Sequence, residues 1–198
     1  MPDTKAPHIP HGLFVLGLFV LIALALTGCA SQGVVRLSSA TSQRAFEARL
    51  PTRVFARQDA NSIDIYMTDL PIERWHPDTS LAGVSASLVH IHQFIAPKPG
   101  ETPISNNASN ATVRYILIAP TGVGIYAGGG FLRASGDTTL HATLVGSTLN
   151  LVHHSAGFSD ALGPSTLTAT VDATGDDRTI AALQARVQAI VQSLASAP

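Results

Sequence analysis

The chain contains very little cysteine, charge or aromatic side chain. Of its 198 residues only Cys29 is a cysteine, so no disulfide can form within the chain. Charged residues make up 13% of the sequence, and the formal net charge is −1. This balance excludes the electrostatic footprint of a nucleic-acid-binding protein, and the sequence offers no polybasic segment for anionic lipid.

Common catalytic motifs are missing as well. Ser155, Ser159 and Ser165 do not lie in a Gly-x-Ser-x-Gly setting, which excludes a hydrolase elbow. Gly128-Gly129-Gly130 lacks the Lys-Ser/Thr of a phosphate loop, so it predicts a bulge or a tight bend in a strand. The carboxylate pair Asp176-Asp177 is explained by helix capping. The sequence therefore favours a non-enzymatic protein.

An apolar run opens the chain. Leu13 to Leu26 is uninterrupted by charge, and Lys5 precedes it. A helix of fourteen residues covers roughly 21 Å, which is short of the ~30 Å needed to span a bilayer. The run therefore predicts the apolar part of a secretory signal peptide rather than a membrane-spanning helix.

The apolar run ends in Leu26-Thr27-Gly28-Cys29, which resembles the lipobox of bacterial lipoproteins. In that family, Leu26, Thr27 and Gly28 would be recognised by the signal peptidase, which cuts before the cysteine. The cysteine sulfur then carries diacylglycerol, and the new amino group is usually acylated. The resemblance implies that residues 1–28 are a cleaved signal peptide and that Cys29 is lipidated. Because a single acyl chain binds a membrane only marginally, several chains are needed for stable anchoring.

The residue after the cysteine bears on localisation. In Gram-negative members of the lipoprotein family, a residue other than aspartate at this position usually permits sorting to the outer membrane. Ala30 follows that rule. The resemblance therefore implies the bacterial cell envelope as the location, with the protein lipid-anchored at the periplasmic face of the outer membrane.

Removal of 28 residues from 198 would leave 170 residues, enough for one domain with its own core. The Ser-rich and aromatic-poor segment 29–50 predicts a lipidated N-terminus followed by a flexible tether, with a short helical turn near 44–50. Residues 51–198 then form a single β domain, because apolar residues alternate with period two between turn signals.

The fold class expected is mainly β: a single antiparallel β-sandwich or barrel-like meander of about eight or nine strands. Within 62–69, Ile63, Ile65 and Met67 face one way and the residues between them face the other. Residues 83–96 form the longest later apolar run, which predicts a strand in the middle of the sheet. Gly146-Ser147 predicts a two-residue hairpin turn. The strands expected are 52–58, 62–69, 83–96, 111–119, 123–127, 131–134, 138–145, 148–153 and 165–173.

One amphipathic helix is expected at the C-terminus, over about 176–195, with Asp176 or Asp177 as its cap. Its apolar residues fall on one stripe, which needs a surface of the sheet to cover. The residues of the stripe are Ile180, Leu183, Val187, Ile190, Val191 and Leu194.

His90-Ile91-His92 is the sharpest local pattern. On a strand the two rings point to the same face about 6.5 to 7 Å apart, a spacing at which both can bind one metal ion such as zinc. The pattern resembles the His-x-His of cupins, although no glutamate follows nearby. Alternatively, both rings fill a half-buried face of the sheet and hydrogen-bond to neighbours. The candidates for a third ligand are Asp64, His141, His153 and His154.

Other candidates are weaker. His153 and His154 lie on opposite faces of a strand, so they predict a strand end rather than a joint metal site. Tyr66, Trp75 and Phe131 could line a ligand pocket, although such aromatics in a β domain usually belong to the core.

These observations predict a lipid-anchored cell-envelope lipoprotein whose β domain has a non-catalytic interaction or structural role. The protein is expected to contact the membrane through the lipid on Cys29 and not to bind nucleic acid. The sequence does not identify a protein or small-molecule partner. Two alternatives remain. One is a periplasmic carrier of a small molecule or lipid, since the strand pattern also resembles lipocalins without their Gly-x-Trp motif. The other is a metal-binding protein that uses His90 and His92.

Overall fold

The computed structural model describes residues 33–42, 44–76, 78–98 and 108–196. The lipobox-like segment Leu26–Cys29 lies outside these residues, and so do the predictions made for it. Across the described ranges, no helix has the length and apolar character required to cross a membrane.

The described residues form nine strands, one short 3₁₀ helix and one α-helix, which confirms the expected mainly β fold with a C-terminal helix. The strands are β1 (Val34–Ser39), β2 (Ala45–Arg49), β3 (Thr52–Arg57), β4 (Ile63–Thr68), β5 (Ala86–Gln93), β6 (Ala111–Ala119), β7 (Gly122–Ser135), β8 (Thr139–His154) and β9 (Ser165–Gly175). The helices are η1 (Ile72–Trp75) and α2 (Asp177–Ala195).

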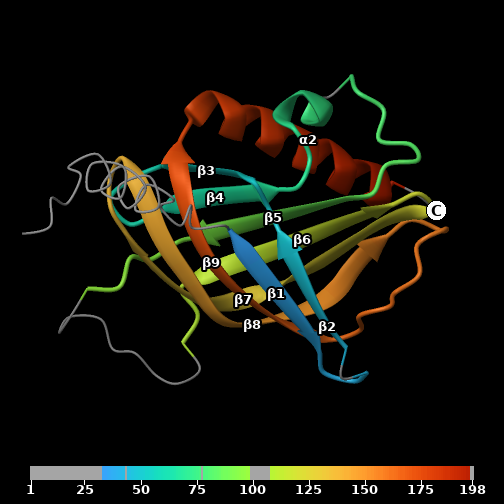
Figure 1. Ribbon diagram of the computed structural model, residues 1–198, viewed down its shortest axis with the longest axis horizontal. Helices are drawn as coiled ribbons and strands as arrows, with labels where there is room; N and C mark the ends of the chain where they lie inside the picture. The colour runs from blue at the N-terminus through green and yellow to red at the C-terminus, as the bar shows by residue number, and fades with distance from the viewer. Residues whose placement is uncertain (1–32, 43, 77, 99–107, 197–198) are drawn as a thin grey trace, which may run out of the picture. The chain divides into compact units, whose positions relative to one another are not determined.

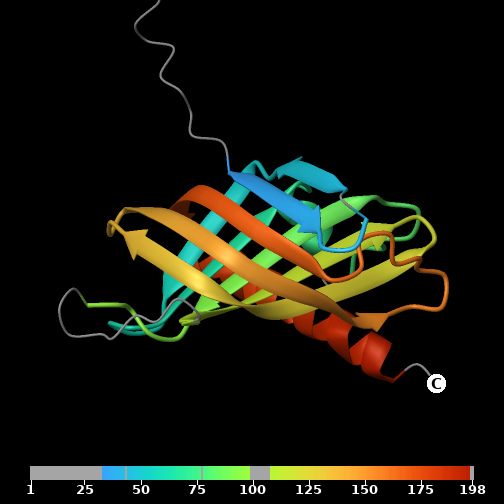
Figure 2. The same cartoon turned by 90° about the horizontal axis from the view of Figure 1, so that it is seen from below.

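All nine strands belong to one sheet, in the order β2-β1-β9-β3-β4-β5-β6-β7-β8. The sheet closes on itself because β8 also pairs with β9 (Figures 1 and 2). Neighbours run antiparallel, except that Val54 and Phe55 of β3 pair in parallel with the end of β9. β5 lies between β4 and β6, as predicted for the apolar run 83–96.

The two faces of the sheet carry separate apolar clusters. Within β4, Ile63, Ile65 and Met67 join the cluster on the inner face of the closed sheet, as the alternation predicted. Tyr66 points to the outer face and joins a second cluster beneath α2. Because apolar burial is the main stabilising term, both clusters contribute to the stability of the domain.

The helix α2 covers part of the outer face, where it crosses the strands beside η1 (Figure 1). Asp176 is the N-cap, and its Oδ1 accepts a hydrogen bond of 3.0 Å from the Thr179 amide. Trp75 of η1 is fully buried in the same cluster, and its Nε1 donates to Thr68 Oγ1 over 3.0 Å. The buried helix residues are Ile180, Leu183, Val187 and Ile190, which lie on the predicted stripe.

The tether predicted over 29–50 is wrong for most of its length, and so is the helical turn near 44–50. Residues 34–39 and 45–49 form the hairpin of β1 and β2. β1 pairs with β9 along its whole length, and Val35 and Leu37 are fully buried in the inner cluster. The strand therefore owes its order to a distant partner, which the Ser-rich local composition does not reveal.

Two long strands, β7 and β8, each replace a pair of short strands expected from the sequence. Gly146-Ser147 is not a hairpin turn: it lies within β8, where the register with β9 shifts between Leu144 and Ser147. Gly146 has a φ of 62°, which a glycine adopts readily. The predicted bulge at Gly128–Gly130 is confirmed by a register shift between Gly129 and Phe131 of β7.

The packing of α2 can be tested at Leu183, which is fully buried in the outer cluster. We expect Leu183→Ala to lower the free energy of unfolding by about 2 to 5 kcal/mol, because it removes buried methyl groups and leaves a cavity. Gln188→Ala, at an exposed position of the same helix, should change it by less than about 0.5 kcal/mol. Urea denaturation measures both, and equal effects would show that α2 does not pack as described.

Candidate functional site

A polar cluster lies on the outer face of the sheet, on β4 and β5. The register places His92 of β5 opposite Asp64 of β4, and His90 opposite Tyr66. Since alternate residues of a strand share a face, all four side chains lie on the same side of the sheet as the residues that α2 covers. The prediction that His90 and His92 share one face is confirmed.

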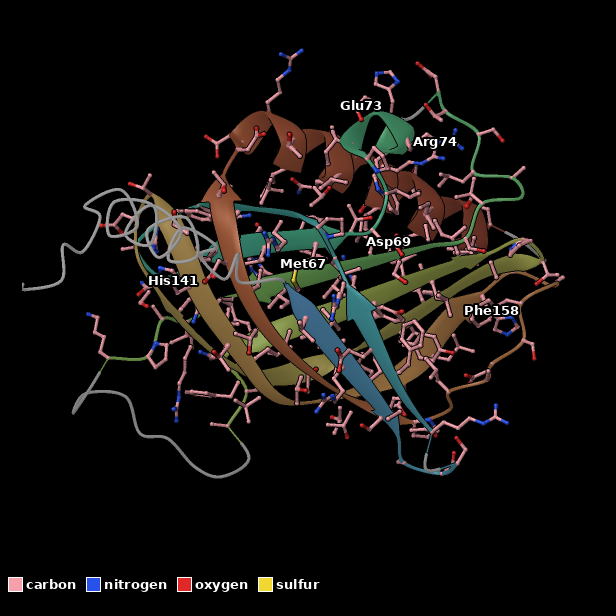
Figure 3. All side chains as sticks on the ribbon, in the orientation of Figure 1. Met67, Asp69, Glu73, Arg74, His141 and Phe158 are labelled. Atoms are coloured by element: carbon pink, nitrogen blue, oxygen red, sulfur yellow. The ribbon has the colours of Figure 1, made fainter. Side chains whose placement is uncertain are left out.

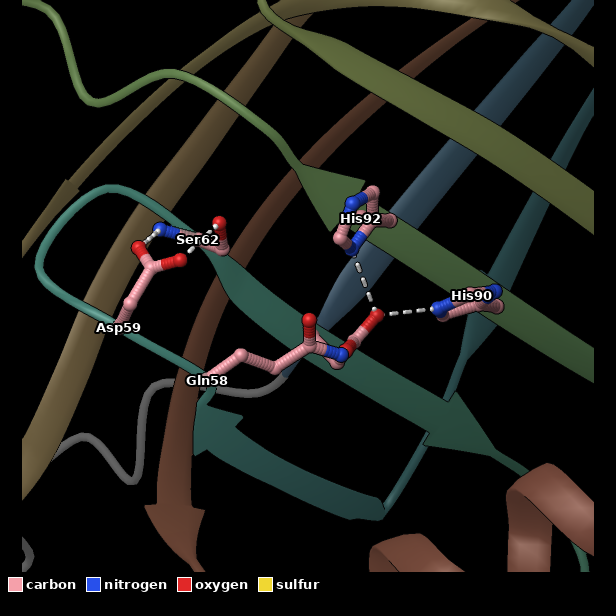
Figure 4. Close-up of polar contacts among 6 residues, drawn as sticks. Gln58, Asp59, Ser62, His90 and His92 are labelled. Atoms are coloured by element: carbon pink, nitrogen blue, oxygen red, sulfur yellow. Dashed lines mark hydrogen bonds and ion pairs between the residues drawn. The ribbon is translucent and has the colours of Figure 1, made fainter.

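Asp64 is the centre of the cluster, because its carboxylate bonds to His90, His92 and Gln58, which are labelled in Figure 4. Its Oδ1 lies 2.7 Å from His90 Nε2 and 3.0 Å from His92 Nδ1. Its Oδ2 accepts a hydrogen bond from Gln58 Nε2. An ionised carboxylate can only accept hydrogen bonds, so both imidazoles present an N–H to the same oxygen. One side chain therefore ties together β4, β5 and the residue that follows β3.

Burial makes this cluster more than a surface contact. The His90 side chain is 12% exposed and Asp64 is 9% exposed, whereas His92 is 30% exposed. The His90 ring stacks on Tyr66 with ring centres 4.3 Å apart and planes 11° apart. Tyr66 belongs to the apolar cluster under α2, so it connects that cluster directly to the polar one.

The two central groups have shifted pKa values. Burial alone would raise the pKa of Asp64, but the hydrogen bonds and charges of His90 and His92 outweigh it and lower that pKa. Burial lowers the pKa of His90, and the opposing effect of Asp64 does not restore it. Arg114 of β6, which lies opposite His90, lowers it further. The folded protein therefore favours an ionised Asp64 beside a neutral His90.

Of the candidates for a third ligand, the structure brings only Asp64 to the two histidines. His141, which is labelled in Figure 3, instead pairs with Asp172 of β9. His153 and His154 end β8 as predicted. In the described part of the chain, no three His, Cys, Asp or Glu side chains are arranged to hold a metal ion. The hydrogen bonds instead match the alternative interpretation, in which the rings fill a half-buried face.

Gln58 is a member of the cluster that the sequence analysis did not single out. The turn that follows β3 positions it, because the Asp59 carboxylate accepts hydrogen bonds from the backbone amides of Asn61 and Ser62. The contact between Asp59 and Ser62 is drawn in Figure 4. The backbone amide of Gln58 then donates to the Ser62 carbonyl over 3.0 Å. Asp59-Ala60-Asn61 is recognisable as a turn, but nothing in the sequence shows that the residue before it reaches Asp64.

The three aromatics considered for a pocket belong to the packing of the sheet. Tyr66 and Trp75 are buried in the outer cluster, and Phe131 is half-buried on β7. A groove of about 550 Å³ does lie between the second half of α2, the 81–83 turn and the turn that joins β6 to β7. It is separate from the Asp64 cluster, since the two share no lining residue.

The Asp64 cluster contains two His–Asp contacts. No protein-family model matches the chain, and no curated protein or solved structure is significantly similar to it. A His–Asp pair acts as a catalytic base when the ring also contacts a nucleophile. Among the hydrogen bonds of the described residues, neither His90 nor His92 contacts a Ser, Thr or Cys side chain. The arrangement is best explained as a set of hydrogen bonds that links β4, β5 and Gln58.

The hydrogen bonds between Asp64 and the two histidines predict that the stability of the domain depends on pH. The ordinary pKa of a histidine is 6.5, and that of His90 is lower in the folded state. The unfolded chain therefore takes up a proton first as the pH falls below about 6.5, and stability present above that pH is lost toward the folded pKa. The lowered pKa of Asp64 acts in the same direction, so further stability is lost as the pH falls below 3.8, the ordinary pKa of an aspartate.

We expect His90→Gln to flatten the fall in unfolding free energy between pH 7 and pH 5, because glutamine can donate to Asp64 but does not titrate. Urea denaturation at a series of pH values measures the slope. His153→Gln, at an exposed position on β8, is the matched control and should leave the slope unchanged. An unchanged slope in His90→Gln would contradict the assigned role of His90.

Proposed function

We propose that this protein is a lipid-anchored lipoprotein of the bacterial cell envelope, held at the periplasmic face of the outer membrane through lipid on Cys29. The observation that carries the proposal is the segment Leu26-Thr27-Gly28-Cys29 at the end of a short apolar run. Cys29 is also the sole cysteine, so it has no disulfide partner within the chain. The first strand, β1, begins at Val34, only a few residues further on.

We propose a non-catalytic interaction or structural role for the β domain. Both faces of the sheet are used for packing, and the half-buried polar cluster around Asp64 satisfies its own hydrogen bonds. The domain retains exposed apolar side chains that a partner could cover. The large ones are Phe46, Phe94, Ile95, Val145 and Val152, which are 38% to 54% exposed.

The two alternative functions receive less support. A carrier would need space within the closed sheet, but side chains as large as Tyr115 and Tyr126 are buried in its inner cluster. Metal binding by His90 and His92 would be left to their other ring nitrogens, Nδ1 of His90 and Nε2 of His92. Among the described residues, no three His, Cys, Asp or Glu side chains are arranged to hold a metal ion.

Lipidation can be tested by growing cells with an alkyne analogue of palmitate. The wild-type protein should incorporate the label, and Cys29→Ser should incorporate none, because the thioether that carries diacylglycerol cannot form. Ser31→Ala, two residues away, is the control and should be labelled like the wild type. Label retained in Cys29→Ser would contradict the proposal.

Sorting provides a separate test of the membrane proposed. Ala30→Asp should move the lipidated protein from the outer to the inner membrane, since aspartate after the cysteine is the retention signal implied by the lipoprotein resemblance. Ala30→Ser should leave the protein in the outer membrane. Density-gradient separation of the two membranes measures the distribution, and an identical distribution of both variants would refute the sorting assignment.

A further inference from the structure

The short link between the lipid and the fold restricts which surface of the domain faces the membrane. Three residues, 30–32, separate Cys29 from Gly33, where the described domain begins. Because a chain extends at most about 3.6 Å per residue, Gly33 cannot lie more than about 14 Å from the lipidated residue. If Cys29 is lipidated as proposed, the surface around Gly33 is at the bilayer.

A hollow lies at this point of the domain. It has a volume of about 380 Å³ and is lined by Gly33, Arg49, Leu50, Pro51 and Arg53. The Leu50 amide donates to the Gly33 carbonyl over 3.1 Å, which holds the end of β2 beside the start of β1. We call this feature the Gly33 hollow.

The lining of the Gly33 hollow carries positive charge. Arg49 is exposed and Arg53 is half-buried, and the other three lining residues are uncharged. The nearby carboxylate of Glu47 is bound by Arg36 Nη2 at 2.8 Å, and the charge of Arg49 also helps to lower its pKa, so three arginines surround one carboxylate here. In a chain with a formal net charge of −1, the guanidinium groups of Arg49 and Arg53 form a local positive site.

Gly33 itself makes room for Arg53. A Cβ atom at position 33 would lie 2.5 Å from Arg53 Cδ, closer than real contacts allow. The arginine stem therefore packs directly over the glycine. This contact keeps Arg53 beside Gly33, the described residue that is nearest to Cys29 in the sequence.

We propose that the Gly33 hollow binds the headgroups of anionic phospholipid in the membrane that holds the anchor. Guanidinium groups donate paired hydrogen bonds to phosphate oxygens, and the exposed, apolar Pro51 suits the interface beside them. The contact would orient the domain, with the start of β1 toward the bilayer and α2 free to meet partners. This inference rests on the proposed lipid anchor, because the anchor is what places Gly33 at a membrane.

Vesicle flotation tests the proposal without the anchor. The mature chain 29–198 carrying Cys29→Ser, which cannot be lipidated, is mixed with vesicles of phosphatidylcholine alone or with half phosphatidylglycerol. Each basic residue near an anionic surface strengthens binding by about fivefold, so the exposed Arg49 should raise partition into the anionic vesicles at least about fivefold.

In the same background, Arg49→Glu should lose at least about fivefold of the partition into anionic vesicles. Arg44→Glu is the matched control, since Arg44 is also exposed but immediately precedes β2, at the strand end opposite Arg49. It should bind like its parent. Circular dichroism and thermal unfolding establish that both variants fold.

Equal partition into the two kinds of vesicle, or equal loss in Arg49→Glu and Arg44→Glu, would overturn the Gly33 hollow as a headgroup site. Neither outcome would affect the anchor, because palmitate labelling of Cys29 is measured separately. Conversely, an unlabelled Cys29 with preserved vesicle binding would refute the anchor and leave the headgroup site standing.

Discussion

The pairing of β9 with three strands is the constraint on which the rest of the structure depends. Along its first half β9 bonds β1 on one side and β8 on the other, and its end reaches β3. The β8 contact closes the sheet and buries the inner cluster, while the β1 contact holds the N-terminal hairpin in place. α2 follows β9 directly. Asp176 Oδ1 caps the first turn of the helix, and the backbone amide of Asp176 donates to the Phe55 carbonyl. The same strand therefore also determines where the helix crosses the outer face.

Closure and the helix together explain why the Asp64 cluster exists. Tyr66 marks the limit of the apolar cluster under α2, and His90 stacks on its ring at that limit. Beyond it the outer face is half-buried, where a carboxylate would be costly without partners. Three donors solve this problem, since His90, His92 and Gln58 supply the hydrogen bonds that burial requires. The cluster is therefore a consequence of the architecture, and it joins neighbouring strands across the part of the outer face that the helix does not cover.

Local patterns could be predicted from the sequence, and long-range pairing could not. The alternation through Ile63, Ile65 and Met67 and the stripe from Ile180 to Leu194 depend only on near neighbours, and both agree with the structure. The hairpin 34–49 was missed because Val34 pairs with Thr170, far along the chain. For the same reason, His90 and His92 could be assigned to one face, but Asp64 remained one of four candidate neighbours. Only the β4–β5 register, set across an irregular connection, selects it.

The central claim is that the domain is tied to a membrane through Cys29, a few residues before β1. It unites the sole cysteine, the short apolar run and the position of the Gly33 hollow, and it leaves the rest of the surface for partners. The most direct measurement is the intact mass of the protein extracted from its native membranes. The account predicts a chain of 170 residues that begins at Cys29 and carries diacylglycerol with a further acyl chain. A mass that includes residues 1–28, or a mature chain without lipid, would contradict it.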